Sequence, residues 1–197
     1  MTPRPGQKTV KRIKSKDAQL IARQTWTAPD AAVADNILNG TLVTGTTLTV
    51  STFLAQPDFA RQLTLLPKTN TADVPAGDVT INGTDIDGNV ISDTLTFLAN
   101  ASTAQVTIKA FKTVTSVVFP TPDGDTATWD LGITDYLGLR EPLEEDSVIL
   151  TLVDDTVEGT RPAVTVLSTD KTQNIMDTST ALDGAKDVTV FYFYPWL

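Results

Sequence analysis

The sequence lacks cysteine and histidine entirely, and it has only two methionines among 197 residues. Without cysteine there is no disulfide framework, no thiolate zinc site and no cysteine nucleophile. Without histidine, the commonest general base, the commonest protein metal ligand and the usual serine triad are also excluded. The chain therefore contains few of the residue types on which active sites are usually built.

Long apolar runs and nucleotide- or hydrolase-type motifs are also missing. No stretch approaches the ~20 consecutive apolar residues of a membrane-spanning helix. The basic N-terminus is not followed by an apolar segment, so we expect no secretory signal and a mature chain that begins at or near Met1. Gly-x-Ser-x-Gly, Gly-x-x-x-x-Gly-Lys-Ser/Thr and Gly-x-Gly-x-x-Gly are absent. We expect no enzyme, no cofactor and no membrane association.

Threonine is abundant, with 34 residues in the chain. Threonine and valine favour strands, because their branched side chains fit a pleated, half-buried surface. About ten short strands separated by turn signals indicate an all-β fold, an antiparallel β-sandwich or barrel of the jelly-roll or immunoglobulin-like kind. We assign residues 1–38 to a basic N-terminal arm and lead-in, and residues 39–197 to the β-sandwich domain.

The local patterns predict individual elements. Residues 17–24 and 30–35 are expected to form short helical turns in the lead-in. Polar and apolar residues alternate through 41–54, and a strand at 61–66 is expected to end at Pro67. Two strand-like runs flank Asp87-Gly88, which matches a two-residue type I′ hairpin turn. Further strands are expected at 105–109, 113–119, 126–131, 147–153, 163–168 and 187–194.

The charges are unevenly distributed along the chain, whose net charge is −9. Residues 1–16 contain no acidic residue, whereas the remaining 181 residues carry nine basic and 24 acidic groups. The protein is therefore an acidic body with a short cationic arm. The basic residues of the arm are Arg4, Lys8, Lys11, Arg12, Lys14 and Lys16.

Three interpretations of the arm are open: a solvated terminus, an anchor on an acidic protein partner or a neighbouring subunit, and a nucleic-acid contact. The acidic body would be repelled by phosphates, and no aromatic residue lies among the charges of the arm to stack on bases. Nucleic-acid binding is therefore the weakest of the three. The residues that we expect to dock the arm on a partner are Arg4, Lys8, Lys11, Arg12 and Lys14.

The C-terminal segment 187–197 holds five of the 13 aromatic residues. In a strand, Val188, Val190, Tyr192 and Tyr194 would face one side, and the phenylalanines between them the other. Both faces would be apolar, so the strand is either central in a core or covered by a partner subunit. Because Trp and Tyr are favoured interface anchors, we name as candidate partner contacts Tyr194, Trp196 and Leu197.

Acidic clusters are the remaining candidates for chemistry. The segment 85–89 resembles a calcium loop, but Gly88 lies at the fourth position and not at the sixth, so we assign this segment, like 123–125, to a turn. Paired carboxylates can bind cations or transfer protons, although neighbours in a loop are more often a solvated rim. We predict no metal site at the two denser patches, which are Glu141, Glu144, Glu145 and Asp146, and Asp154, Asp155 and Glu158.

The most specific signal is an ordered set of segments within residues 40–194. The set consists of 55–64 with Gln56-Pro57-Asp58-x-x-Arg61, the hairpin 78–97, 109–116 with Lys-Ala-Phe-x-x-Val-Thr-Ser, 135–139, and 180–192 with Asp183-Gly184-x-Lys186-Asp187-Val188. This order resembles that of a family of tailed-bacteriophage virion proteins. The N-terminal arm lies outside the resemblance.

The resemblance implies a structural role in the virion, which is assembled in the bacterial host cytoplasm. It implies a capsid decoration or cement protein that binds the major capsid protein or other virion subunits, as a homo-oligomer. A neck, collar or tail component and, less readily, a host- or glycan-binding module are the alternatives. Trp26 and Trp129 are the candidates for a glycan platform. Asp58 and Arg61 are expected to pair and fix a turn.

Overall fold

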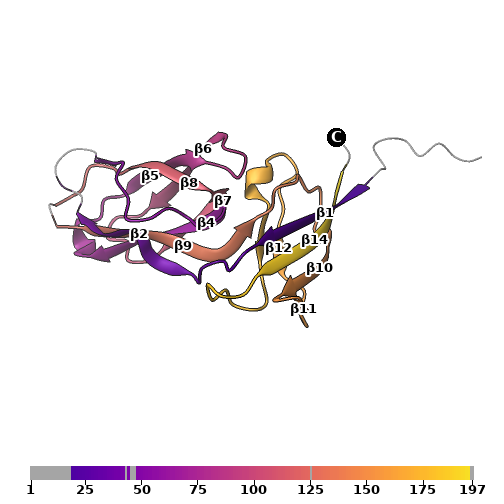
Figure 1. Cartoon of the computed structure of the whole chain (residues 1–197). Helices are drawn as coiled ribbons and strands as arrows, with labels where there is room; N and C mark the ends of the chain where they lie inside the picture. The colour runs from indigo at the N-terminus through magenta and orange to yellow at the C-terminus, as the bar shows by residue number, and fades with distance from the viewer. Residues whose placement is uncertain (1–18, 43, 45–47, 125, 196–197) are drawn as a thin grey trace, which may run out of the picture.

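The computed structural model describes residues 19–42, 44, 48–124 and 126–195. These residues form antiparallel sheets with two single-turn 3-10 helices, so the expected all-β class is confirmed. The molecule is elongated, and the first and last strands lie side by side at one end (Figure 1).

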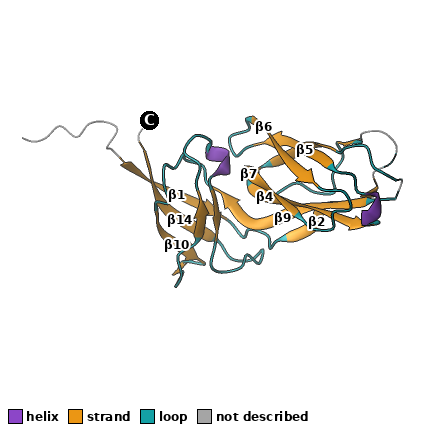
Figure 2. Ribbon diagram, turned by 180° about the vertical axis from the view of Figure 1, so that it is seen from behind, coloured by secondary structure: helices purple, strands orange, loops and turns teal. Residues whose placement is uncertain are grey.

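The strands are β1 (Gln19–Trp26), β2 (Val33–Leu42), β3 (Thr49–Val50), β4 (Arg61–Thr69), β5 (Gly77–Thr84), β6 (Val90–Phe97), β7 (Gln105–Phe111), β8 (Thr113–Val118), β9 (Thr128–Gly138), β10 (Val148–Val153), β11 (Thr156–Val157), β12 (Ala163–Thr165), β13 (Ile175–Asp177) and β14 (Val188–Pro195). The 3-10 helices are η2 (Thr71–Asp73) and η3 (Lys171–Gln173). Helix η2 lies at the end of the molecule away from β1 and β14, and η3 lies nearer to them (Figure 2).

The strands form three sheets. Sheet A has the order β1-β14-β10-β11, and sheet C has the order β3-β8-β5-β6. Sheet B runs β12-β13-β9-β4-β7, and β2 also pairs with β9. Strand β9 is the longest, and it pairs with β2 over its first half and with β13 over its last three residues.

Sheets B and C pack face to face around the larger core. Alternate residues of β4, β5, β6 and β9 enter this core, as the period of two in a half-buried strand requires. Trp129 of β9 lies at the centre, with its ring 5.0 Å from that of Phe97 and 5.3 Å from that of Phe119. The sandwich contains the larger of the two main hydrophobic cores, and sheet A is attached to it.

Strand β9 continues out of the sandwich into a second core beneath sheet A. The last residues of β9 and the loop that follows it contribute Leu137, Leu139 and Leu143, which pack with Trp26 and Tyr192. Strand β9 therefore connects sheet A to the sandwich.

A glycine is required at position 132, because a Cβ there would overlap the carbonyl oxygen of Val33 where β2 pairs with β9.

Several local expectations are wrong. The lead-in holds no described helix: residues 19–26 are strand β1, and β2 begins at Val33. Both strands are stabilised by pairing with β14 and β9, which local propensity does not reveal. The expected domain boundary at 38/39 falls inside β2. Of the expected alternating run 41–54, only the end of β2 and the two residues of β3 are strand among the described residues.

Two further corrections concern turns. Strand β4 continues through Pro67 to Thr69, with an irregular register between these two residues. The hairpin at 78–97 is present, but its loop spans 85–89 between the paired Thr84 and Val90. The Asp85 carboxylate accepts hydrogen bonds from the backbone N–H groups of Asp87 and Asn89, both at 2.9 Å. This turn is longer than the two-residue type I′ turn.

Candidate assembly surface on sheet A

Of the residues predicted to bind a partner, only Tyr194 lies within the described part of the chain. Arg4, Lys8, Lys11, Arg12, Lys14, Trp196 and Leu197 lie outside it. Tyr194 is half-buried and packs against the core beneath sheet A. It pairs with Leu20 of β1. Tyr194 therefore points to the inner side of the sheet, and its predicted partner contact stays untested.

The inner face of sheet A is an ordinary sheet-to-core contact. Trp26 of β1, Val188, Val190 and Tyr192 of β14 and Val148 of β10 are all buried there. The Tyr192 hydroxyl donates to Gln24 Oε1 at 3.2 Å and accepts from the Glu141 backbone N–H at 3.3 Å. Burial raises the pKa of Tyr192 to about 12. This face follows the predicted alternation of the C-terminal strand.

The outer face of sheet A is also apolar, and it is exposed. Ile21 of β1 is 62% exposed and lies directly opposite Phe193 of β14, which is 36% exposed. Ile149 of β10 is 50% exposed and Val157 of β11 is 58% exposed. Among the described residues, no strand or helix covers this face (Figure 1). We call it the sheet A outer face, made of Ile21, Arg23, Thr25, Ile149, Leu150, Leu152, Val157, Thr189, Phe191 and Phe193.

A β-bulge in β10 adds to this apolar surface. The register with β14 shifts between Val148 and Leu150, so Ile149 is an extra residue in the strand. Val148 remains buried on the core side, whereas Ile149 is exposed. The bulge therefore places one more aliphatic side chain on the outer face.

The single cation on the outer face is held by an aromatic ring. The Arg23 guanidinium lies 5.9 Å from the ring centroid of Phe191, its direct cross-strand partner. A cation–π contact of this kind contributes about 0.5–1 kcal/mol at an exposed site. Beside it, the Thr25 and Thr189 hydroxyls are 2.9 Å apart. Arg23 and the two threonines on this face thus already have partners within sheet A.

Acidic residues border both ends of the sheet A outer face. At the end where β1 starts, Glu144 and Glu145 line a small hollow with Gln19, Phe193 and Tyr194. Both glutamates are exposed, and neither forms an ion pair with another described residue. At the other end lie Asp154 and Asp155, in the turn between β10 and β11, with φ angles of 51° and 60°. Acidic residues from both patches of the sequence therefore form a rim at the two ends of an apolar face.

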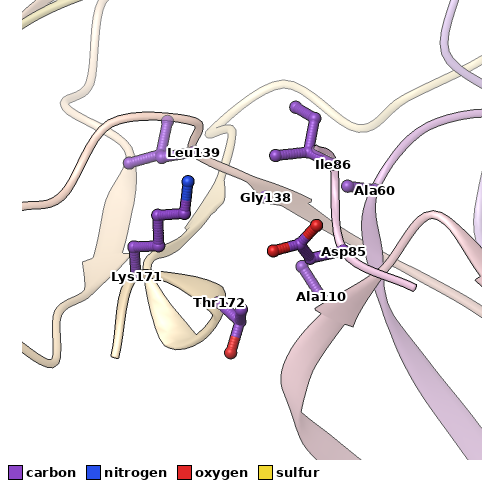
Figure 3. Close-up of a pocket in the computed structure, with 8 residues that line it drawn as sticks. All are labelled: Ala60, Asp85, Ile86, Ala110, Gly138, Leu139, Lys171 and Thr172. Carbon is purple, nitrogen blue, oxygen red and sulfur yellow. The ribbon is translucent and has the colours of Figure 1, made fainter. Parts of the chain in front are cut away.

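Two hollows away from the sheet A outer face are lined by side chains that make structural contacts. One is lined by Asp85, Ile86, Lys171 and other residues, and it holds a volume of about 10 Å³, room for about one water molecule (Figure 3). A larger hollow, about 190 Å³, lies between sheet A and the sandwich and includes Lys112 and Arg140. Both cations are engaged: Lys112 Nζ donates to the Asp58 carbonyl at 2.6 Å, and Arg140 Nε contacts Asp87 Oδ1 at 3.2 Å.

Asp87 in the hairpin loop connects sheet C to the segments around sheet A. It forms ion pairs with Lys171 and Arg140. The hydrogen bond from Lys171 holds the pKa of Asp87 below its usual value, and Arg140 lowers it further. The Asp-Gly loop that resembles a calcium loop is therefore a structural contact between two parts of the molecule. Among the described residues, no group of three or more acidic side chains is arranged to hold a metal ion.

The Gln56-Pro57-Asp58-x-x-Arg61 motif also performs a structural role. Arg61 is fully buried, and its Nε lies 2.9 Å from Asp58 Oδ1, as predicted from their spacing. A second guanidinium nitrogen donates to the Asp30 carbonyl at 2.6 Å, which fixes the connection between β1 and β2. The Gln56 side chain accepts from Val114 N–H at 2.6 Å and donates to its carbonyl at 3.1 Å. The motif thus joins the start of β4 to sheet C and to the lead-in to β2.

The candidate glycan platform is not available on the surface. Trp26 and Trp129 are each 1% exposed, because one packs beneath sheet A and the other lies at the centre of the sandwich. The residues of the outer face were missed from the sequence because β1 was expected to be helical. Leu20, Ile21 and Ala22 are consecutive apolar residues, so no alternation in 19–26 indicates a strand, and only the pairing of β1 with β14 places Ile21 opposite Phe193.

The chain matches no family model, no curated protein and no solved structure in the three comparisons. Within the part of the chain that the structure describes, no helix has both the length and the apolar character needed to cross a bilayer.

Proposed function

We propose that this protein is a non-enzymatic structural subunit of a tailed-phage particle, specifically a capsid decoration protein that binds and stabilises the assembled head. The observation that carries the proposal is the sheet A outer face. Four antiparallel strands present Ile21, Phe193, Ile149 and Val157 to solvent beside an acidic rim. A contiguous apolar surface bordered by polar residues is typical of a protein interaction site.

A decoration role fits the physical properties of such a surface. A protein that binds the assembled shell and not its free subunits stabilises the shell by mass action. Because the same contact is repeated at many sites, modest affinity at each site adds up over the particle. The acidic body, by keeping a net negative charge on the outside, would keep decorated particles apart in solution. The resemblance in residues 40–194 points to the same role.

The proposal is tested by sedimenting purified protein with heads that were assembled without it. We expect saturable binding with a copy number that scales with the number of capsomers. Ile21→Thr combined with Phe193→Thr should weaken this binding at least tenfold. The matched control is Val90→Thr with Leu98→Thr, which removes two apolar side chains that are 86% and 77% exposed but lie in or next to β6. This control should bind as the wild type does.

Two outcomes contradict the proposal. Binding limited to one ring of copies per particle would place the protein in the neck, collar or tail. Absence of binding to heads and to tails would remove the virion role altogether. Circular dichroism melting of both double variants shows whether each is folded before its binding is compared.

A further inference from the structure

We propose that the sheet A outer face is a homotypic docking surface, and that the basic segment 1–16 of a neighbouring copy covers it. This inference rests on the proposed function in one respect, because it takes the face to be an assembly surface. It adds which part of a neighbouring chain binds to the sheet A outer face. The observations behind it are the charge of the rim, the point where the segment joins sheet A, and the area of the face.

Charge complementarity identifies the segment. Glu144 and Glu145 at one end and Asp154 and Asp155 at the other end border an apolar face. The occupant that fits therefore carries cationic groups for the two acidic ends and a few apolar side chains for the face between them. Segment 1–16 has six basic residues and no acidic residue, and Val10 and Ile13 lie among its charges. Opposite potentials of this kind favour the encounter and fix its register.

The position of the segment favours binding to a second copy. It joins β1 at Gln19, at the same end of sheet A as Glu144 and Glu145. Since β1 runs from this end into the sheet, the segment would have to reverse direction at once to reach its own outer face. A neighbour placed beyond the end of β1 requires no such reversal.

The area of the face supports the same occupant. Three strands of six to eight residues present a face of about 400 Å². Two such faces packed together bury less than the roughly 800 Å² per partner of a standard interface. A segment of 16 residues spans up to ~50 Å when extended, longer than the ~27 Å of an eight-residue strand. It therefore reaches both acidic ends and adds the area that two bare faces lack.

The contact is heterologous, because the segment of one copy lies on the sheet of the next. Such contacts close into rings when the rotation between copies allows it and otherwise give open chains. On a capsid surface, this arrangement would link neighbouring decoration proteins to one another, so the substitutions of Ile21 and Phe193 would weaken decoration of the head by removing these links.

The experiment measures self-association of the full-length protein by sedimentation velocity at low and high salt. We expect concentration-dependent oligomers that dissociate as salt increases. Lys8→Gln, Lys11→Gln, Arg12→Gln and Lys14→Gln combined should raise the dissociation constant at least tenfold, and so should Ile21→Thr with Phe193→Thr. Val90→Thr with Leu98→Thr should leave the constant unchanged. The melting temperatures of all variants confirm that they are folded.

Carbodiimide cross-linking of mixed ¹⁴N- and ¹⁵N-labelled protein then identifies the contact. Mixed-label cross-links between lysines of segment 1–16 and Glu144 or Glu145 support the inference. Cross-links confined to one label, a monomer at all concentrations, or oligomers that ignore the four arm substitutions overturn it. A monomer that still decorates heads refutes this inference and leaves the proposed function standing. An oligomer that does not bind heads supports this inference and contradicts the proposed function.

Discussion

Sheets A and C are both four-stranded and antiparallel, and each buries one face, but their outer faces have opposite chemistry. On sheet C, the cross-strand neighbours on the outer face include Thr80 opposite Thr94 and Asn82 opposite Ser92. On sheet A, Ile21 lies opposite Phe193. An antiparallel sheet with one solvated face normally alternates apolar and polar residues. Sheet C follows this rule, and sheet A departs from it.

The outer face of sheet C is also internally satisfied by hydrogen bonds. Thr96 Oγ1 donates to Asp78 Oδ1 at 2.7 Å, and the Thr84 and Thr113 hydroxyls lie 2.7 Å apart. Its edge strand β6 carries Asp93, whose carboxylate accepts from Ile108 N–H of β7 at 2.6 Å. Several polar side chains of sheet C are therefore hydrogen-bonded within the molecule. The comparison teaches that threonine and other polar residues line the outer face of sheet C, whereas the outer face of sheet A exposes large apolar side chains.

The largest expected effect on stability comes from a substitution in the buried core, which we compare with one on the sheet A outer face. Trp129→Ala removes the aromatic centre of the sandwich and should lower the free energy of unfolding by about 3–5 kcal/mol. Phe193→Ala should change it by less than about 1 kcal/mol, because this ring is 36% exposed in the isolated protein. Urea titration measures both. Equal losses would show that the sheet A outer face is buried in the isolated chain, and the comparison would fail.

The buried Arg61 joins the start of β4 to the connection between β1 and β2. Arg61→Met leaves the Asp58 carboxylate and the Asp30 carbonyl without their partner, and we expect a loss of about 2–3 kcal/mol. The control is Arg161→Met, which breaks the 2.8 Å pair with Asp146 at a side chain that is 54% exposed. That loss should stay below about 1 kcal/mol. If the two variants unfold at the same urea concentration, the buried contacts of Arg61 with Asp58 and Asp30 do not contribute the expected stability.

The contribution of Tyr192, on the inner face of sheet A, to the free energy of unfolding is expected to depend on pH. Tyr192→Phe removes the hydroxyl that bridges Gln24 and Glu141, at an expected cost of about 1 kcal/mol near neutral pH. In the wild type, the folded-state pKa of about 12 lies above the ordinary value of 10.0. The contribution of the neutral phenol is therefore fully present below pH 10 and is lost as the pH rises through about 12. The stability advantage of the wild type should shrink over this window, and urea titrations at pH 9, 10 and 11 would reveal it. Parallel pH profiles for the two proteins would contradict this.

The sequence predicted the all-β class, most strands after residue 60 and the two faces of the C-terminal strand, because these depend on alternation within one segment. It did not predict β1, since the segment 19–24, with apolar residues only at 20–22, is compatible with a helix when read alone. Pairing with β14 decides that segment, and this partner lies more than 160 residues away. The sheet A outer face depends on the same pairing. It also depends on the bulge at Ile149, which no local pattern indicates.

The smallest expected effect on stability tests whether apolar chemistry alone makes a sheet face associate. Thr80→Val with Thr94→Val replaces one cross-strand pair on the outer face of sheet C by two β-branched residues of nearly equal size. Because both favour strands, the free energy of unfolding should change by less than about 0.5 kcal/mol. Sedimentation velocity should show no new oligomer, since two side chains bury little area. New oligomers that form in high salt would show that any apolar sheet face suffices. The distinction between the two sheets would then rest on composition and not on the charged segment and the rim that it meets.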